Sequence, residues 1–230
     1  MILPALMLVF GFFYSLVRLL SGRIIKDRKL RKKWDLPSKD ISFENEAVVI
    51  TVADLDKDLT PLFLAASIAN NHEDLFKYHV NVSPMIDEKT FALYLTDKLK
   101  QPSEVVYKIF SKRLNKIVGC ASLMNIRPDY GSIEVGSIWY SKIAQRTEIN
   151  TNVMFLLFCY VFETLEYRRL EWKCNSKNEA SMKAALRLGF DYEGLFRQHV
   201  VSRGENRDTA WYSIIDSEWK DKKELLGRKT

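Results

Sequence analysis

The chain has 230 residues, 47% of them hydrophobic, which is enough for one domain with a sizeable core and an extension. Its three cysteines have no metal-ligand spacing, so we expect free thiols, a reducing compartment and no metal site. The formal net charge of +6 originates in residues 23–33, which hold seven basic residues and one acidic residue. Trp34 is the one aromatic residue beside these charges, so a nucleic-acid-binding role is not expected.

The N-terminal segment is hydrophobic. Residues 1–17 carry no charge, and Leu19 and Leu20 continue the apolar run past Arg18. A helix of about 20 residues spans about 30 Å, the thickness of a hydrocarbon core. The segment lacks the basic start and the A-x-A site of a secretory signal. We therefore expect residues 1–22 to form a helix that anchors the chain to a membrane, followed by a basic linker over residues 23–42.

The charges behind this segment predict its orientation. Basic residues after the helix favour a cytoplasmic location for the rest of the chain, and they attract anionic lipid headgroups. Three alternatives stay open. The helix lies on the membrane, it packs on the domain, or it is absent from a mature protein that is then cytoplasmic.

The remaining sequence predicts a domain over residues 43–220 and a polar tail over residues 221–230. Apolar alternation indicates strands, and apolar spacing of three to four indicates helices. In chain order we expect a strand at 47–52, helices at 62–69 and 87–100, strands at 105–111, 116–125 and 132–140, a helix at 152–165, a strand at 169–173, a helix ending before Gly189, and strands at 193–202 and 207–215. This order predicts an α/β (α+β) domain with helices on both faces of a mixed, mostly antiparallel sheet.

Residues 173–190, KCNSKNEASMKAALRLGF, are the most informative segment for function. Asn178 and Ser181 lie where a helix N-terminus presents free N–H groups, directly after a strand, and Gly189 is a natural helix terminator. The pattern N-x-x-S followed by L-G-F resembles the acetyl-CoA side of the GCN5-related N-acetyltransferases, the GNAT superfamily. It is most similar to the branch that acetylates N-terminal alanine or serine of ribosomal proteins. The resemblance extends over residues 43–219.

The resemblance implies a fold and a cosubstrate site. In the superfamily two central parallel strands splay apart, and acetyl-CoA enters the gap. Here those strands are residues 132–140 and 169–173. A splayed strand leaves backbone groups unpaired, and the pantetheine arm satisfies them. By position, the main chains of Ile138, Trp139 and Tyr140 would pair with that arm.

The turn after this strand is the expected pyrophosphate site. Superfamily members usually carry Q/R-x-x-G-x-G/A here, so that backbone N–H groups wrap the pyrophosphate at a helix N-terminus. This chain keeps Gln145 and Arg146 but has Glu148 and Asn150 where glycines usually stand. The cosubstrate-binding residues expected from the resemblance are Ile138, Trp139, Tyr140, Gln145, Arg146, Thr147, Asn150, Thr151, Asn178 and Ser181. Thr151 is also the expected helix cap.

Acetyl transfer to an amine requires a base for the amine and a proton for the leaving thiolate. Glu134 is the preferred base, because the family often has an acidic residue before this glycine, and Glu171 and His199 are alternatives. Many relatives donate the proton from a tyrosine at the position of Ala185, so Ser181 is the expected donor here. Aromatic residues of the early helices and the last hairpin are candidates for the acceptor wall: Phe76, Tyr78, Phe196 and Tyr212.

Two functions fit these observations. The first is an acetyl-CoA-dependent N-acetyltransferase that transfers the acetyl group to a primary amine, such as a protein or peptide N-terminus, by direct attack in a ternary complex. The alternative is a non-catalytic acyl-CoA-binding or membrane-tethered interaction protein on the same fold.

Overall fold

The computed structural model describes residues 33–67, 75–80, 82, 87–228 and 230. The expected membrane helix, residues 1–22, therefore lies outside the described residues. Within the described part of the chain, no helix combines the length and the apolar character needed to cross a membrane.

The described residues form an eight-stranded sheet in the spatial order β1-β2-β3-β4-β5-β6-β8-β7. Neighbouring strands are antiparallel except β5 and β6, which are parallel. The strands are β1 (Ser42–Glu44), β2 (Val48–Val52), β3 (Val105–Ser111), β4 (Lys116–Arg127), β5 (Ser132–Tyr140), β6 (Arg169–Asn175), β7 (Asp191–Ser202) and β8 (Glu205–Ile215). The predicted mixed, mostly antiparallel sheet is confirmed, and β1 is a strand that the sequence pattern did not indicate.

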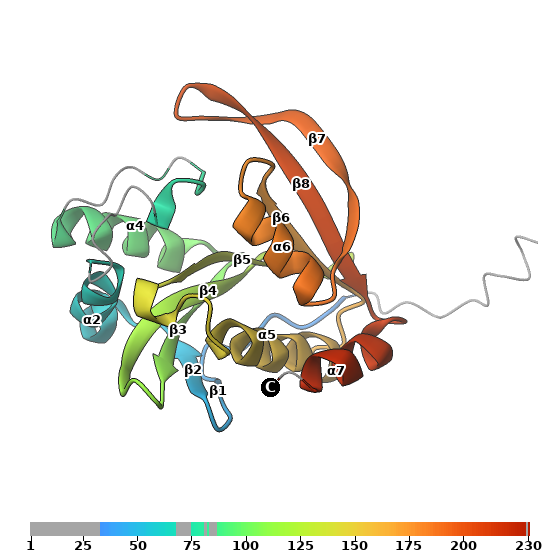
Figure 1. Ribbon diagram of the computed structural model, residues 1–230, viewed down its shortest axis with the longest axis horizontal. Helices are drawn as coiled ribbons and strands as arrows, with labels where there is room; N and C mark the ends of the chain where they lie inside the picture. Colours follow the sequence, from blue (N-terminus) through green and yellow to red (C-terminus); the bar gives the residue numbers. More distant parts are fainter. Residues whose placement is uncertain (1–32, 68–74, 81, 83–86, 229) are drawn as a thin grey trace, which may run out of the picture. The chain divides into compact units, whose positions relative to one another are not determined.

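Helices cover both faces of this sheet (Figure 1). On one face, α2 (Leu55–Ser67) and α4 (Glu88–Lys100) pack on β3, β4 and β5 through a cluster that contains Phe91 and Trp139. The opposite face carries α5 (Ile149–Cys159) with a following π-helical turn (Tyr160–Thr164), α6 (Glu179–Arg187) and α7 (Trp219–Gly227). Because helices cover both faces of the sheet, most residues of β3, β4 and β5 are buried.

Local sequence explains where these elements begin and end. Asp87 caps α4 by accepting a hydrogen bond from the N–H of Thr90 at 2.7 Å. Asn115 has a positive φ of 49° in the β3–β4 turn, a conformation that asparagine tolerates. Arg203 and Gly204 have φ of 54° and 79° in the β7–β8 turn, the two positive values that a two-residue hairpin loop requires. Both predicted hairpins are confirmed.

The β7–β8 hairpin projects beyond the rest of the sheet (Figure 1). Arg203 at its turn connects it to the segment that precedes α4. The Nη2 atom of Arg203 donates to the carbonyl oxygens of Phe76 at 3.1 Å and Val82 at 2.7 Å. The hairpin thus contacts the face of the sheet that carries α2 and α4.

The ends of the domain pack more extensively than the sequence pattern indicates. Trp34, in the expected linker, is buried against Tyr167, and its Nε1 donates to the carbonyl oxygen of Glu166 at 2.7 Å. α7 begins inside the expected domain with Trp219 and continues into the expected polar tail, where Leu226 is also part of the core. Residues on both sides of the expected 43–220 boundaries therefore contribute to the fold.

Candidate active site

The two parallel strands separate after three residue pairs. Ser132, Ile133 and Glu134 of β5 face Arg169, Leu170 and Glu171 of β6, and the pairing stops there. Beyond that point β5 pairs with β4 alone, while β6 pairs with β8 alone. The facing edges of both strands consequently offer backbone N–H and C=O groups that a ligand can satisfy.

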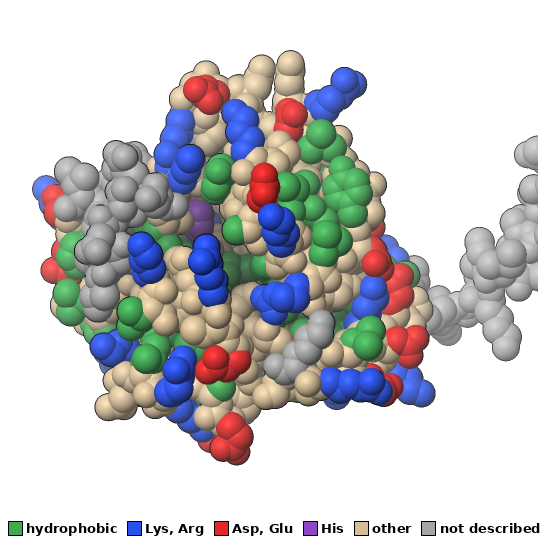
Figure 2. All heavy atoms as spheres, in the orientation of Figure 1, with side chains coloured by type: hydrophobic (Ala, Val, Ile, Leu, Met, Phe, Trp, Pro, Cys, Tyr) green, Lys and Arg blue, Asp and Glu red, His purple; other side chains and the backbone are tan. Residues whose placement is uncertain are grey.

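A cleft of about 190 Å³ opens at this separation. Figure 2 shows a hollow below the projecting hairpin, with Lys and Arg side chains gathered at its rim. The cleft is lined by Tyr78, His79, Val80, Val82, Lys98, Met124, residues 134–138, residues 172–175, Asn178, Ser181 and Arg207. Four of the predicted catalytic and cosubstrate residues, Glu134, Ile138, Asn178 and Ser181, thus meet in one cavity. Of the acceptor-wall candidates, Tyr78 lines this cavity, and Phe76, Phe196 and Tyr212 do not.

A β-bulge shapes the β5 wall of the cleft. Cys120 of β4 faces Trp139, but Ser122 faces Gly136, so β5 has one residue more than β4 between these pairs. Ser137, within this bulge, has a φ of 49°. Gly119 permits the close approach of β4 there, because a Cβ atom at that position would lie 2.2 Å from the carbonyl oxygen of Trp139.

Glu134 lies buried in the cleft beside a lysine that bridges two carboxylates. Its Oε2 accepts hydrogen bonds from Lys173 Nζ at 2.7 Å and from Asn125 Nδ2 at 2.6 Å. Lys173 Nζ also lies 2.8 Å from Glu171 Oε2 and 4.2 Å from the centre of the Trp211 ring. With Oε2 held in this way, Oε1 lies above Gly136, where a Cβ atom would be 3.3 Å away.

Glu171, the first alternative base, is more heavily engaged. It pairs with Lys173, with Arg169 Nε at 2.8 Å and with Arg127 Nη2 at 2.9 Å. Burial raises the pKa of Glu171, but the hydrogen bonds from Arg169 and Lys173 outweigh burial and the net pKa is lowered. A carboxylate with three cationic partners is a weak proton acceptor, and Glu171 does not line the cleft.

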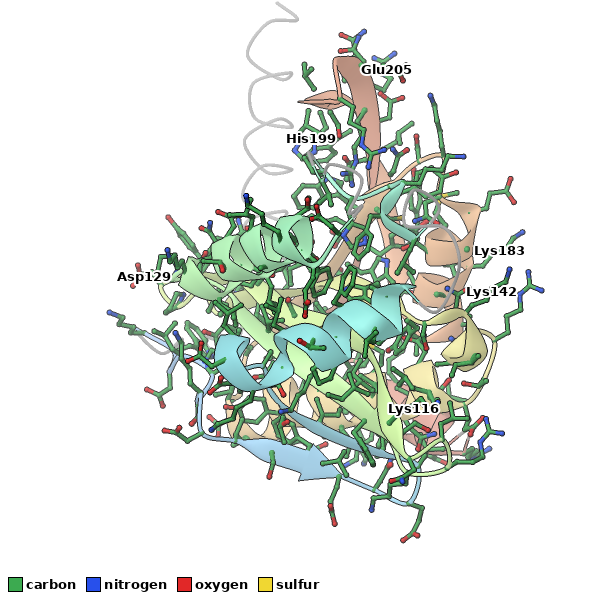
Figure 3. The ribbon with its side chains drawn as sticks, turned by 90° about the vertical axis from the view of Figure 1, so that its left-hand side faces the viewer. Lys116, Asp129, Lys142, Lys183, His199 and Glu205 are labelled. Carbon is green, nitrogen blue, oxygen red and sulfur yellow. The ribbon has the colours of Figure 1, made fainter. Side chains whose placement is uncertain are left out.

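His199, the second alternative base, lies on the projecting hairpin, as Figure 3 shows relative to Glu205 at the hairpin tip. Its Nδ1 lies 3.1 Å from Thr209 Oγ1, and its ring packs edge-on against Phe196 and Trp211. The cleft lining does not include His199. Glu134 is therefore the predicted base that the fold places in the cavity.

Ser181 stands at the start of α6 on the β6 wall. Its N–H donates to Oδ1 of Asn178 at 3.1 Å, which is the helix cap expected from the sequence. Its Oγ accepts from Nε1 of Trp172 at 3.0 Å, so its hydroxyl proton can be donated, either to the neighbouring Cys174 sulfur or to a ligand. Burial raises the pKa of the neighbouring Cys174 thiol, and a hydrogen bond with Ser181 opposes that rise. Ala185, at the position where many relatives have the proton-donating tyrosine, is fully buried on the inner face of α6.

The end of β5 is joined to the start of α5 by side-chain hydrogen bonds. Gln145 Nε2 donates to the carbonyl oxygen of Tyr140 at 2.9 Å, and the Tyr140 hydroxyl donates to Asn150 Oδ1 at 3.1 Å. The prediction that Thr151 caps α5 is wrong, because the helix begins at Ile149 with Glu148 in the cap position. Thr151 lies buried in the first turn and accepts from Arg187 Nη1 at 2.6 Å.

The turn before α5 takes an unusual backbone conformation. Arg146 has a φ of 59°, a value typical of glycine, and is exposed. The Thr147 hydroxyl donates to the carbonyl oxygen of Ala144 at 2.7 Å. The positive φ thus falls on Arg146 rather than on Glu148 or Asn150, the positions where the family usually has glycine. The predicted cosubstrate residues of this turn and of the start of α5, together with Trp139 and Tyr140, lie outside the cleft lining.

Sequence reasoning missed four charged or titratable side chains of the cleft: His79, Lys98, Lys173 and Arg207. Burial, and then the charges of Lys98 and Arg207, lower the pKa of His79 to about 4, so its imidazole is neutral at physiological pH. Lys98 Nζ donates to Ser137 Oγ at 2.9 Å. Alternation on β6 places Lys173 on the same face as Glu171, which is the one signal for this group in the sequence.

Comparison with known proteins assigns the family. The family model of the acetyltransferase (GNAT) domain matches residues 50–191. The chain belongs to the GNAT family of N-acetyltransferases. This match confirms the resemblance that N-x-x-S and L-G-F indicated. GNAT acetyltransferases use acetyl-CoA as cosubstrate.

Solved GNAT structures match most of the chain. A GCN5-related N-acetyltransferase from Brucella melitensis is 35% identical with a TM-score of 0.81, and the match covers 86% of this chain and 88% of that one. A GNAT-family protein from Chromobacterium violaceum is 30% identical with a TM-score of 0.76, over 84% of this chain and 94% of that one. Among curated proteins, Bacillus subtilis YdaF, whose name describes a ribosomal N-acetyltransferase, is 31% identical over 46% of this chain. That match spans 58% of the length of YdaF.

Proposed function

We propose that this protein transfers the acetyl group of acetyl-CoA to a primary amine by direct attack in a ternary complex. One observation carries the proposal: β5 and β6 separate directly after Glu134, so a buried carboxylate lies at the base of a cleft whose wall has unpaired backbone groups. The name of YdaF supports a protein or peptide N-terminus as the acceptor class.

The cosubstrate is proposed to enter along the β5 edge. The backbone groups of Ile138, Trp139 and Tyr140 pair with the amides of the pantetheine arm, which repeats the hydrogen bonding that a neighbouring strand would provide. The pyrophosphate lies at the N-terminus of α5, where unpaired N–H groups and the helix dipole favour an anion. Arg146, exposed at this turn, adds a positive charge.

The chemistry needs two proton transfers. The amine nitrogen attacks the thioester carbonyl carbon, an N–C bond forms and the C–S bond breaks. Glu134 takes the amine proton through Oε1, directly or by one water, since Oε2 is held by Lys173 and Asn125. The Ser181 hydroxyl gives a proton to the departing thiolate. Solvent takes the proton from Glu134 and returns one to Ser181, so the products are the N-acetylated amine and free CoA, and both side chains regain their starting protonation.

Glu134→Gln tests the proposal. The amide keeps the size of the side chain but cannot accept the proton, so turnover should fall by about 10²- to 10⁴-fold. Affinity for acetyl-CoA, measured by calorimetry, should stay within about twofold, because none of the proposed cosubstrate contacts involves the Glu134 side chain. Glu205→Gln at the exposed hairpin tip is the matched control and should behave as the wild type.

Ser181→Ala should reduce turnover less, because solvent can also protonate a thiolate. Wild-type turnover in Glu134→Gln would rule out Glu134 as the base. Failure of the protein to bind acetyl-CoA at millimolar concentration would refute the proposed function itself, and binding without transfer to any amine would favour the non-catalytic alternative.

A further inference from the structure

Arg207 is the cleft residue whose position the proposed chemistry does not explain. It lies near the start of β8, beyond the last β6–β8 pair, Asn175 with Thr209. Strand alternation puts it on the same face of the sheet as Thr209 and Trp211, the face that carries Lys173. Arg207 lines the cleft, and its Nε and Nη1 atoms are buried without a hydrogen-bond partner among the described residues.

The other described cations of the cleft have partners. Lys98 pairs with Glu104 Oε2 at 3.3 Å and donates to Ser137, while Lys173 bridges Glu134 and Glu171. A guanidinium with two buried, unsatisfied N–H groups is costly unless something occupies them. Arginine stays protonated at physiological pH, so Arg207 leaves a positive charge that the described cleft residues do not neutralise.

Arg207 faces the acceptor part of the cleft. It shares the cleft with His79, in the segment before α4, and with Glu134, the proposed base, and its charge helps to lower the pKa of His79. The proposed phosphate site lies at the N-terminus of α5, and none of the residues of that turn lines the cleft with Arg207. Ile138, Asn178 and Ser181 do share the cleft with Arg207, but the pantetheine arm that they would contact carries no negative charge. An anionic group bound by Arg207 would therefore belong to the molecule whose amine reaches Glu134.

We propose that the acceptor carries a carboxylate close to its reactive amine and that Arg207 binds this carboxylate. The planar fork of a guanidinium matches a carboxylate with two parallel N–H···O bonds. This inference rests on the proposed function and names its substrate class. Two sources supply the chemistry: the α-carboxylate of a free amino acid, or an Asp or Glu side chain near a peptide N-terminus.

Matched acceptors test the inference with the full-length protein. Serine is compared with serinamide, and the amidated peptide Ser-Glu-Ala with Ser-Gln-Ala, each with acetyl-CoA and detection of released CoA. The acceptor with the carboxylate should have a kcat/KM about 10- to 100-fold higher in one of these pairs, and that pair identifies the source. Arg207→Gln should abolish this preference, Arg207→Lys should retain part of it, and exposed Arg197→Gln on β7 is the matched control.

Three results would overturn the inference. They are transfer to both members of each pair at equal rates, an unchanged preference in Arg207→Gln, and a raised KM for acetyl-CoA in that variant, which would assign Arg207 to the cosubstrate. If no amine is acetylated, the proposed function fails separately, and a binding measurement decides on the carboxylate site. Calorimetry with N-acetylserine and with acetylated Ser-Glu-Ala amide should then show binding of one of them, which Arg207→Gln loses and Arg197→Gln keeps. Absence of binding of both to the wild type would refute the carboxylate site.

Discussion

Replacing Lys173 with methionine should destabilise the protein strongly. Lys173 lies 2.7 Å from Glu134 and 2.8 Å from Glu171, and the three side chains are 12%, 6% and 5% exposed. Glu171 keeps Arg127 and Arg169 in the variant, whereas Glu134 keeps only the amide of Asn125. Removing one partner of a buried ion pair costs about 3–5 kcal/mol, because the remaining charge is left without compensation.

For a domain of this size, 1 kcal/mol lowers Tm by about 2–4 °C, so Lys173→Met should lower Tm by about 10 °C at pH 7.5. Thermal unfolding followed by circular dichroism measures this difference.

Two further variants isolate the cause. The double variant Lys173→Met with Glu134→Gln removes the uncompensated charge and should recover most of the lost Tm. Lys183→Met breaks an exposed pair with Glu179, where the lysine is 78% exposed, and should change Tm little. A Lys173→Met protein within about 2 °C of the wild type, or a double variant no more stable than the single one, would refute the reasoning.

Three other outcomes are expected. Gly119→Ala should weaken acetyl-CoA binding and lower stability by about 1–3 kcal/mol, since the new methyl group would meet the Trp139 carbonyl at 2.2 Å; unchanged calorimetry and Tm would contradict this. His79 has a folded pKa of about 4 against an ordinary 6.5, so it contributes stability above pH 6.5 that is lost as the pH falls toward 4, up to about 3 kcal/mol. Urea unfolding should show that His79→Gln removes this part of the pH dependence. For the apolar residues 1–20 and the basic residues 23–33, we propose a membrane anchor, with full-length protein resisting alkaline carbonate extraction; release by salt alone would indicate electrostatic attachment instead.

Local patterns were sufficient for most of the fold. Alternating apolar residues located both hairpins, and the positive-φ residues Asn115 and Gly204 stand in the expected turns. Thr151 was misassigned because a threonine before an apolar run is typical of a helix cap, while the helix in fact begins two residues earlier. Pattern alone cannot show that the buried Arg187–Thr151 contact holds this threonine inside the first turn.

The candidate site was predicted less completely, for a physical reason. Glu134 and Ser181 belong to strand and helix signals that are local in sequence, and the fold brings both to the cleft. Lys173 on β6 contacts Glu134 on β5 and Trp211 on β8, and Arg207 on β8 lines the cleft between β5 and β6, so the placement of both depends on strand order. The lowered pKa of His79 depends on its burial in the folded domain, which no local sequence pattern encodes.

The attachment of the projecting hairpin has a consequence for how acceptor preference can diversify. Arg203 holds the hairpin to the segment before α4 through the carbonyl oxygens of Phe76 and Val82, and every amino acid supplies a carbonyl oxygen. Between those two anchors, Tyr78, His79 and Val80 line the cleft. Substitutions at these three positions can therefore alter the shape and polarity of the cavity while the anchoring hydrogen bonds persist, so selection for new acceptors can act on this wall without dismantling it.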